Sequence, residues 1–167
     1  MITEKLITLL NTRSDELSAS WVRMIKENEN TSTSLGFDQE ELVSYARFVY
    51  RQLELWLDWQ TTSAEVAKLF WQVGVDKKAQ EVSLAELHYG LTLARRNLYI
   101  NILEKLGEDD LVDMKELIAF TSRITYFFDK ISFFAIKGYE GLEGPSTQDE
   151  SALDGILNAF RSGASAD

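Results

Sequence analysis

The chain has 167 residues, of which 45% are apolar and 26% charged, which suits one globular domain with a sizeable core and excludes disorder of the whole chain. Its net charge of −10 and its pI of about 4.6 argue against nucleic acid and anionic membranes as partners, because both bind basic surfaces. The sequence has no cysteine, no recognisable signal peptide and no uncharged apolar run long enough to span a membrane, so we expect a cytoplasmic protein.

Residues 3–28 are expected to form the first helix, because their apolar positions keep helical spacing without an intervening Gly or Pro. These positions are Leu6, Leu10, Leu17, Trp21, Met24 and Ile25. The polar residues 11–14 could bend this helix or divide it in two. Residues 28–36 are rich in Asn, Thr and Ser, whose side chains compete for backbone hydrogen bonds, and are expected to form a loop.

Three capping-box patterns, each with an Asp, Thr or Ser three residues before a Glu, mark the starts of the next helices. The pairs are Asp38 with Glu41, Thr62 with Glu65 and Ser83 with Glu86. The first of these helices is expected to end near residues 59–60, and the third near residue 106, before Gly107 as a C-terminal cap. The second contains Gly74, which lies either near its end or at a close contact, and residues 77–81 extend it or connect it to the next helix.

The last long helix, residues 109–138, is the most apolar element, with five aromatic side chains within residues 125–136. A helix that is apolar on several faces is expected to be buried on more than one side. We expect one side to pack on the preceding helix. We assign its remaining apolar face, formed by Phe120, Phe127 and Phe134, to the interface of a homodimer.

These elements predict an all-α domain over residues 3–140, built from five main helices. Residues 141–167 are expected to be a linker, a short amphipathic helix over residues 151–161 and a disordered tail. The apolar positions of the short helix are Leu153, Ile156, Leu157 and Phe160. The sequence leaves open whether this helix docks on the bundle or on a partner.

His88, Arg95 and Tyr99 share one helical face and are the clearest candidates for ligand binding. His88 could ligate haem or act in acid–base catalysis, or it could be a partly buried histidine in a hydrogen bond. One of Arg95 and Arg96 could neutralise a buried carboxylate such as Asp129 or hold a small anion, or the pair could be a surface arginine and an arginine with its stem on the core and its head in water. We favour the structural interpretation of these residues, because no second ligand or catalytic partner accompanies them.

The other polar clusters predict no metal and no cofactor. The position of the glutamates at helix starts is enough to account for them. The Glu-x-x-His pattern of a di-iron bundle is absent. The tryptophans at positions 21, 56, 59 and 71 are mostly explained by core packing rather than by a ligand cavity or a dimer interface. Gly-x-Gly-x-x-Gly, Gly-x-Ser-x-Gly and P-loop patterns are also absent, so we do not expect an enzyme.

Residues 70–99 resemble part of the N-terminal sensor domain of the RsbR and RsbRD type, co-antagonist proteins of the bacterial stressosome. The matching features are an aromatic residue three positions before a glycine, a Ser-x-x-Glu helix start and a basic pair in the helix that follows. In this chain they are Trp71 with Gly74, Ser83 with Glu86, and Arg95 with Arg96. With the amphipathic start of the chain included, the resemblance covers about residues 3–140.

The resemblance implies a non-haem, globin-like helical bundle that dimerises and passes a signal to an attached output domain. The phosphorylatable domain that usually follows does not fit after Gly138, so we expect a stand-alone sensor or adaptor, or a truncated piece. We therefore expect a non-catalytic bacterial signal-sensing or regulatory domain that acts through dimerisation, with a small apolar ligand as one candidate signal. The alternatives are a haem-binding globin-type sensor that uses His88 and an enzyme that uses Arg95 and Arg96 on a small anion.

Overall fold

The computed structural model describes residues 2–31, 38–105 and 114–146, and its secondary structure in these residues is helical. The helices in chain order are α1 (Ile2–Thr12), α2 (Ser14–Glu27), α3 (Gln39–Leu57), α4 (Ser63–Ala79), α5 (Leu84–Lys105) and α6 (Met114–Glu140). The predicted all-α class is confirmed. The helix predicted over residues 3–28 is divided at Arg13, inside the polar run, so the described part has six helices rather than five. The short helix predicted over residues 151–161, and Gly107, lie outside the described residues.

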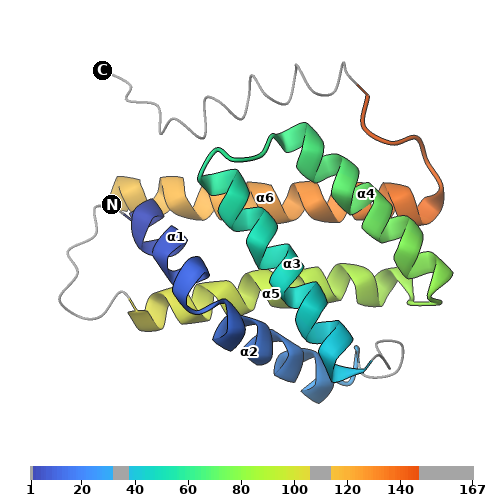
Figure 1. The fold of residues 1–167 in the computed structure, drawn as a ribbon, viewed down its shortest axis with the longest axis horizontal. Helices are drawn as coiled ribbons and strands as arrows, with labels where there is room; N and C mark the ends of the chain where they lie inside the picture. Colours follow the sequence, from blue (N-terminus) through green and yellow to red (C-terminus); the bar gives the residue numbers. More distant parts are fainter. Residues whose placement is uncertain (1, 32–37, 106–113, 147–167) are drawn as a thin grey trace.

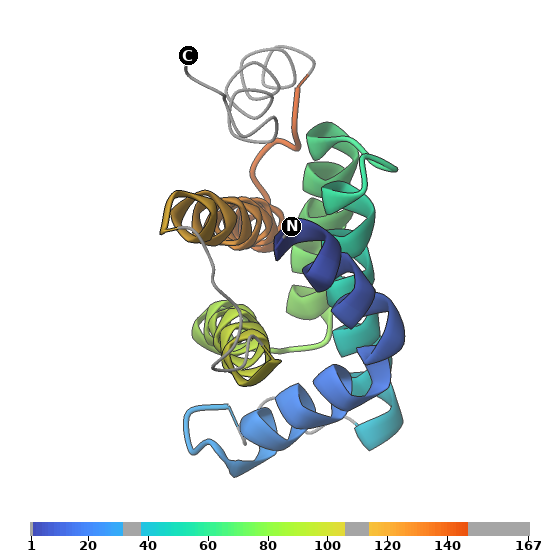
Figure 2. The same cartoon turned by 90° about the vertical axis from the view of Figure 1, so that its left-hand side faces the viewer.

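The helices form two layers, with α5 and α6 side by side in one and α1, α3 and α4 in the other (Figures 1 and 2). The helix α2 packs on both α3 and α5, and α4 lies along α6. The helix α6 contacts α1, α4 and α5, so it is buried on more than one side, as its apolar faces predict. Neighbours in sequence are not always the main partners, because α4 packs far more extensively on α6 than on α3 or α5.

Local capping signals account for the starts of α4 and α5. Thr62 and Glu65 form the predicted capping box, in which Glu65 N donates to Thr62 Oγ1 at 3.2 Å and Thr62 N donates to Glu65 Oε2 at 2.9 Å. Ser83 accepts a hydrogen bond from the amide of Glu86 at 3.2 Å. Asp38 precedes α3 as predicted, but its side chain makes no capping hydrogen bond, so the capping box expected there is wrong.

Two glycines allow α4 and α6 to cross with their backbones in contact. A Cβ atom on Gly74 would lie 1.8 Å from the carbonyl oxygen of Ala135, and one on Gly138 would lie 1.9 Å from the carbonyl oxygen of Trp71. Any side chain at either position would force the two helices apart. Of the two roles predicted for Gly74, the structure therefore selects the close contact.

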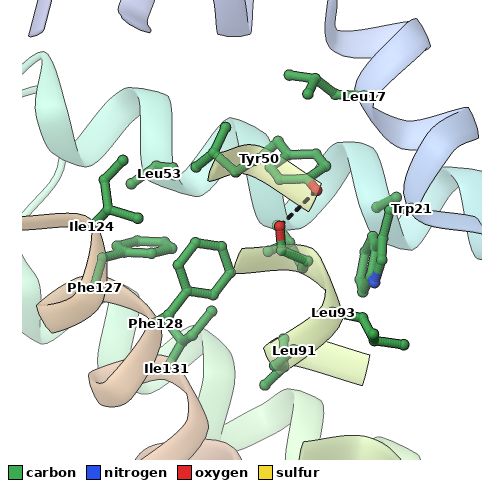
Figure 3. Close-up of a cluster of buried hydrophobic side chains, with 14 of the residues drawn as sticks. Leu17, Trp21, Tyr50, Leu53, Leu91, Leu93, Ile124, Phe127, Phe128 and Ile131 are labelled. Atoms are coloured by element: carbon green, nitrogen blue, oxygen red, sulfur yellow. Dashed lines mark hydrogen bonds between the residues drawn. The ribbon is translucent and has the colours of Figure 1, made fainter. Parts of the chain in front are cut away.

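The core lies between the two layers and is rich in aromatic side chains (Figure 3). Phe127 of α6 packs against Trp56 of α3 and Phe70 of α4, with ring centres 5.6 and 6.4 Å apart. Trp21 of α2 contacts Tyr50 of α3 at the other end of the core, with ring centres 6.0 Å apart. These large buried side chains tie together helices that are distant in the sequence.

A buried polar group also crosses the core. The side-chain amide of Asn97 in α5 donates to the hydroxyl of Tyr50 and to the carbonyl oxygen of Leu17 in α2. The Tyr50 hydroxyl in turn donates to the carbonyl oxygen of Ala94, the bond drawn dashed in Figure 3. Burial raises the pKa of Tyr50, although the hydrogen bond from Asn97 acts in the opposite direction. This arrangement satisfies polar atoms that would otherwise be costly to bury.

Candidate functional site

The face of α5 on which the sequence places candidate ligand-binding residues joins α5 to α6. Arg95 Nη1 lies 3.0 Å from Asp129 Oδ1. The Tyr99 hydroxyl donates to the carbonyl oxygen of Thr121 at 3.1 Å and lies 3.0 Å from Thr125 Oγ1. Burial raises the pKa of Tyr99, and the hydrogen bond with Thr125 and the charge of Arg95 partly oppose this effect. These contacts fix the register of α5 against α6.

The four predicted residues line neither of the cavities described below. Asp129 is the partner that the sequence suggested for an arginine, but its side chain is 66% exposed rather than buried, and such a pair contributes at most about 1 kcal/mol. His88 and Arg96 are exposed on α5. Arg95 is therefore engaged by Asp129, Arg96 is exposed, and His88 has no enclosing pocket of the kind that haem requires among the cavities described below.

The aromatic face assigned to a dimer partner lies inside the single chain. Phe120, Phe127 and Phe134 are 3%, 1% and 3% exposed, and the first two belong to the central core. The expectation of an uncovered apolar face at these positions is therefore wrong. The physical reason is that α1, α3 and α4 together supply the covering that the sequence pattern assigned to a second copy.

A different set of apolar side chains is exposed on α5 and α6. Their exposed fractions lie between 41% and 67%, and the set comprises Ile100, Leu103, Met114 and Ile118. We call these four residues the α5–α6 patch. Sequence analysis missed it, although Met114 and Ile118 keep the helical spacing of Thr121 and Thr125, which is the line that meets α5.

The register of the two helices brings the members of this patch together. The helices are antiparallel, since Arg95 pairs with Asp129 and Tyr99, one turn further along α5, pairs with Thr125. One more turn along α5 reaches Leu103, and the matching steps back along α6 reach Thr121 and then Ile118. The end of α5 and the beginning of α6 accordingly lie at the same end of the bundle (Figure 1).

A small enclosed cavity lies between α2, α3, α4 and α5. Its volume is about 10 Å³, and its lining includes Trp21, Tyr45, Lys77, Glu86 and Gly90. The Tyr45 hydroxyl is buried without a hydrogen-bond partner, and burial raises its pKa. A cavity of this size holds one water molecule at most, so it offers no room for an apolar ligand.

An open polar depression adjoins this cavity through Lys77. Its volume is about 450 Å³, and it is lined by Asp38, Glu40, Glu41, Leu42, Ser44, Lys77 and Gln80. Burial lowers the pKa of Lys77, while the charges of Glu41 and Asp76 raise it, and the ammonium lies 4.6 Å from the centre of the Tyr45 ring. The depression resembles a solvated surface more than a binding site, because it has no apolar floor and no converging set of donors.

No family model, curated protein or solved structure matches this chain, so the argument for a function depends on the geometry. Within residues 2–31, 38–105 and 114–146, no three His, Asp or Glu side chains gather in a way that could hold a metal ion. None of the helices in these ranges is both long and apolar enough to cross a membrane. Of the features described, the α5–α6 patch is the one that would gain most from a partner.

Proposed function

We propose that this chain is a non-catalytic regulatory domain of a bacterial signalling system that acts by self-association through the α5–α6 patch. The observation that carries the proposal is the exposure of four large apolar side chains at the adjoining ends of two long helices. Contiguous apolar surface on a soluble domain marks interaction sites more often than single exposed residues do. A twofold axis beside the patch would bury it against the same residues of a second copy.

The packing order of the helices supports the globin-like arrangement that the resemblance to RsbR-type sensor domains implies. In a simple up-and-down bundle, each helix packs mainly on its neighbours in sequence. Here α2 packs on α5, and α4 packs on α6 in preference to α3 and α5. We place the domain in the cytoplasm and assign its output to a partner signalling protein or domain.

Sedimentation or light scattering of the chain at micromolar concentration tests the proposal. We expect a dimer, and we expect Leu103→Asp and Ile118→Asp each to convert it to a folded monomer, because a charge would be buried in the new interface. Leu69→Asp on α4 is the matched control, since Leu69 is also an exposed leucine but lies in the other layer. This variant should remain dimeric.

Circular dichroism and thermal unfolding of all three variants separate loss of the interface from loss of the fold. A wild-type chain that stays monomeric at tens of micromolar would overturn the proposal. So would a dimer that survives both substitutions in the α5–α6 patch.

A further inference from the structure

The chain leaves α6 through a turn that directs it back across α4. Gly141 has a φ of +73°, and the amide of Leu142 donates to the carbonyl oxygen of Lys137, which closes the end of the helix. The indole nitrogen of Trp71 in α4 then donates to the carbonyl oxygen of Leu142 at 2.9 Å. A Cβ atom on Gly144 would lie 3.7 Å from the Trp71 ring, so the chain stays beside α4 as it leaves α6.

Two aromatic and two basic side chains lie near one another on α6. Phe134 is buried although it lies outside the central core cluster, and the adjacent Phe133 is 57% exposed. Lys137 Nζ lies 5.7 Å from the ring centres of both Phe133 and Phe134, and Nζ of the buried Lys130 lies 5.9 Å from that of Phe134. We call Trp71, Phe133, Phe134 and Lys137 the α4–α6 seam. It is an apolar strip beside one partly exposed cation, Lys137, in a chain whose net charge is −10.

We propose that the α4–α6 seam is the docking site of the chain's own C-terminal segment, residues 151–161. The apolar residues of this segment recur with helical spacing at Leu153, Ile156, Leu157 and Phe160. Acidic residues at positions 149, 150 and 154 complement Lys137 of the seam. The apolar side of the segment would cover Phe133, and its acidic end would face Lys137.

Chain length favours this segment over a foreign partner. The five steps from residue 146 to residue 151 span at most about 18 Å, and a helix over residues 151–161 is about 16 Å long. Phe133 and Lys137 are separated by about 6 Å along α6, so the segment is long enough to contact both. Tethering raises its effective concentration at the seam to roughly the millimolar range, which a free partner seldom attains.

Hydrogen–deuterium exchange of the full-length chain tests the docking. An isolated helix of this length is marginal in water, and Gly155 weakens it further. Without docking, the amides of residues 153–160 should therefore exchange at unprotected rates. With docking, we expect protection of about tenfold or more, independent of protein concentration.

Variants on both sides identify the contact. We expect Leu157→Asp in the segment and Phe133→Asp in the seam each to abolish the protection, while thermal unfolding remains cooperative. Asn158→Asp is the control, because it adds the same charge on the polar side of the segment and should leave the protection unchanged.

Unprotected amides in the wild-type chain would overturn the proposal, and so would protection that persists in Phe133→Asp. Protection that rises with protein concentration would assign the seam to a second copy instead of the same chain. The α5–α6 patch plays no part in this experiment, so Leu103→Asp should retain the protection whether or not it dissociates a dimer.

Discussion

The side-chain amide nitrogen of Asn97 lies 2.8 Å from the hydroxyl oxygen of Tyr50. Both side chains are buried, and Asn97 also donates to Leu17, so one amide connects α5 with α2 and α3. Replacing both partners of such a buried hydrogen bond by apolar groups changes the stability of the fold little. Replacing only one partner leaves the other buried and unsatisfied, which costs more stability. The pair therefore helps to specify how three helices meet.

Tyr50→Phe is expected to lower the free energy of unfolding by about 1–2 kcal/mol, because the Asn97 amide loses one of its two acceptors. Asn97→Ala should cost at least as much, since it also removes the bond to Leu17. Urea unfolding of the two single variants and the double variant measures their coupling, which we expect to exceed about 0.5 kcal/mol. Additive effects would contradict a direct interaction.

Tyr45→Phe should have the opposite outcome. Its hydroxyl is buried without a partner, so its removal relieves a desolvation cost instead of breaking a bond. We expect the variant to be as stable as the wild type, or more stable by up to about 1 kcal/mol. The same urea titration compares it with Tyr50→Phe, and a similar loss in both variants would show that the Tyr45 hydroxyl has a partner.

Two Gly→Ala substitutions, one at the contact between α4 and α6 and one outside it, are expected to change the stability of the fold in opposite directions. Gly138→Ala places a methyl group against the Trp71 carbonyl and should destabilise the chain by about 3 kcal/mol or more. Gly90→Ala in α5 is the control, because no atom lies within 4 Å of the added Cβ and alanine favours helix by about 1 kcal/mol. In thermal unfolding, the midpoint temperature should be lower than that of the wild type for Gly138→Ala and higher for Gly90→Ala.

Glu65 predicts a small pH dependence of stability. The backbone hydrogen bond from Thr62 lowers the pKa of Glu65 in the folded chain, with further help from the hydroxyls of Thr61 and Thr62. Its stabilising contribution is therefore complete above the unfolded pKa, near 4.5, and is lost as the pH falls through the folded pKa. Because Glu65 is exposed, the contribution should be only a few tenths of a kcal/mol, roughly.

Comparison with Glu65→Gln isolates this charge, because glutamine keeps an acceptor for the capping box. We expect the wild type to be slightly more stable at neutral pH and the difference to shrink as the pH falls below the unfolded pKa, near 4.5. Urea titrations at neutral and at acidic pH measure it. A difference that grows on acidification would reverse the predicted sign.

Signals that act over a few residues were predicted well from the sequence. The Thr62–Glu65 capping box and the break near Arg13 depend on neighbouring side chains and backbone groups, which the sequence contains in full. Gly74 was recognised as unusual, but its partners at Ala135 and Tyr139 could not be identified, because a glycine indicates close approach without naming what approaches.

Apart from the Asp38–Glu41 capping box, the predictions that failed concern which element covers which face. Helical periodicity correctly marked Phe120 and Phe127 as apolar, yet it cannot distinguish burial by α3 and α4 from burial by a second copy. The α5–α6 patch was missed for the same reason, since the sequence pattern of Leu103 and Ile118 is that of core residues and their exposure follows only from the register of α5 and α6. The pairing of Arg95 with Asp129 was suggested correctly, but not the exposure of that carboxylate.

The position of α6 in the chain has a consequence for synthesis on the ribosome. This helix is the last of those described, and it supplies Phe127, Phe128 and Ile131 to the centre of the core. The hydrogen bond from Arg123 to Thr3 even ties it to the first helix across almost the whole sequence. The apolar faces of α1 to α5 therefore stay uncovered in the nascent chain until α6 emerges from the exit tunnel, so the core of this domain closes only after residue 140 has left the ribosome.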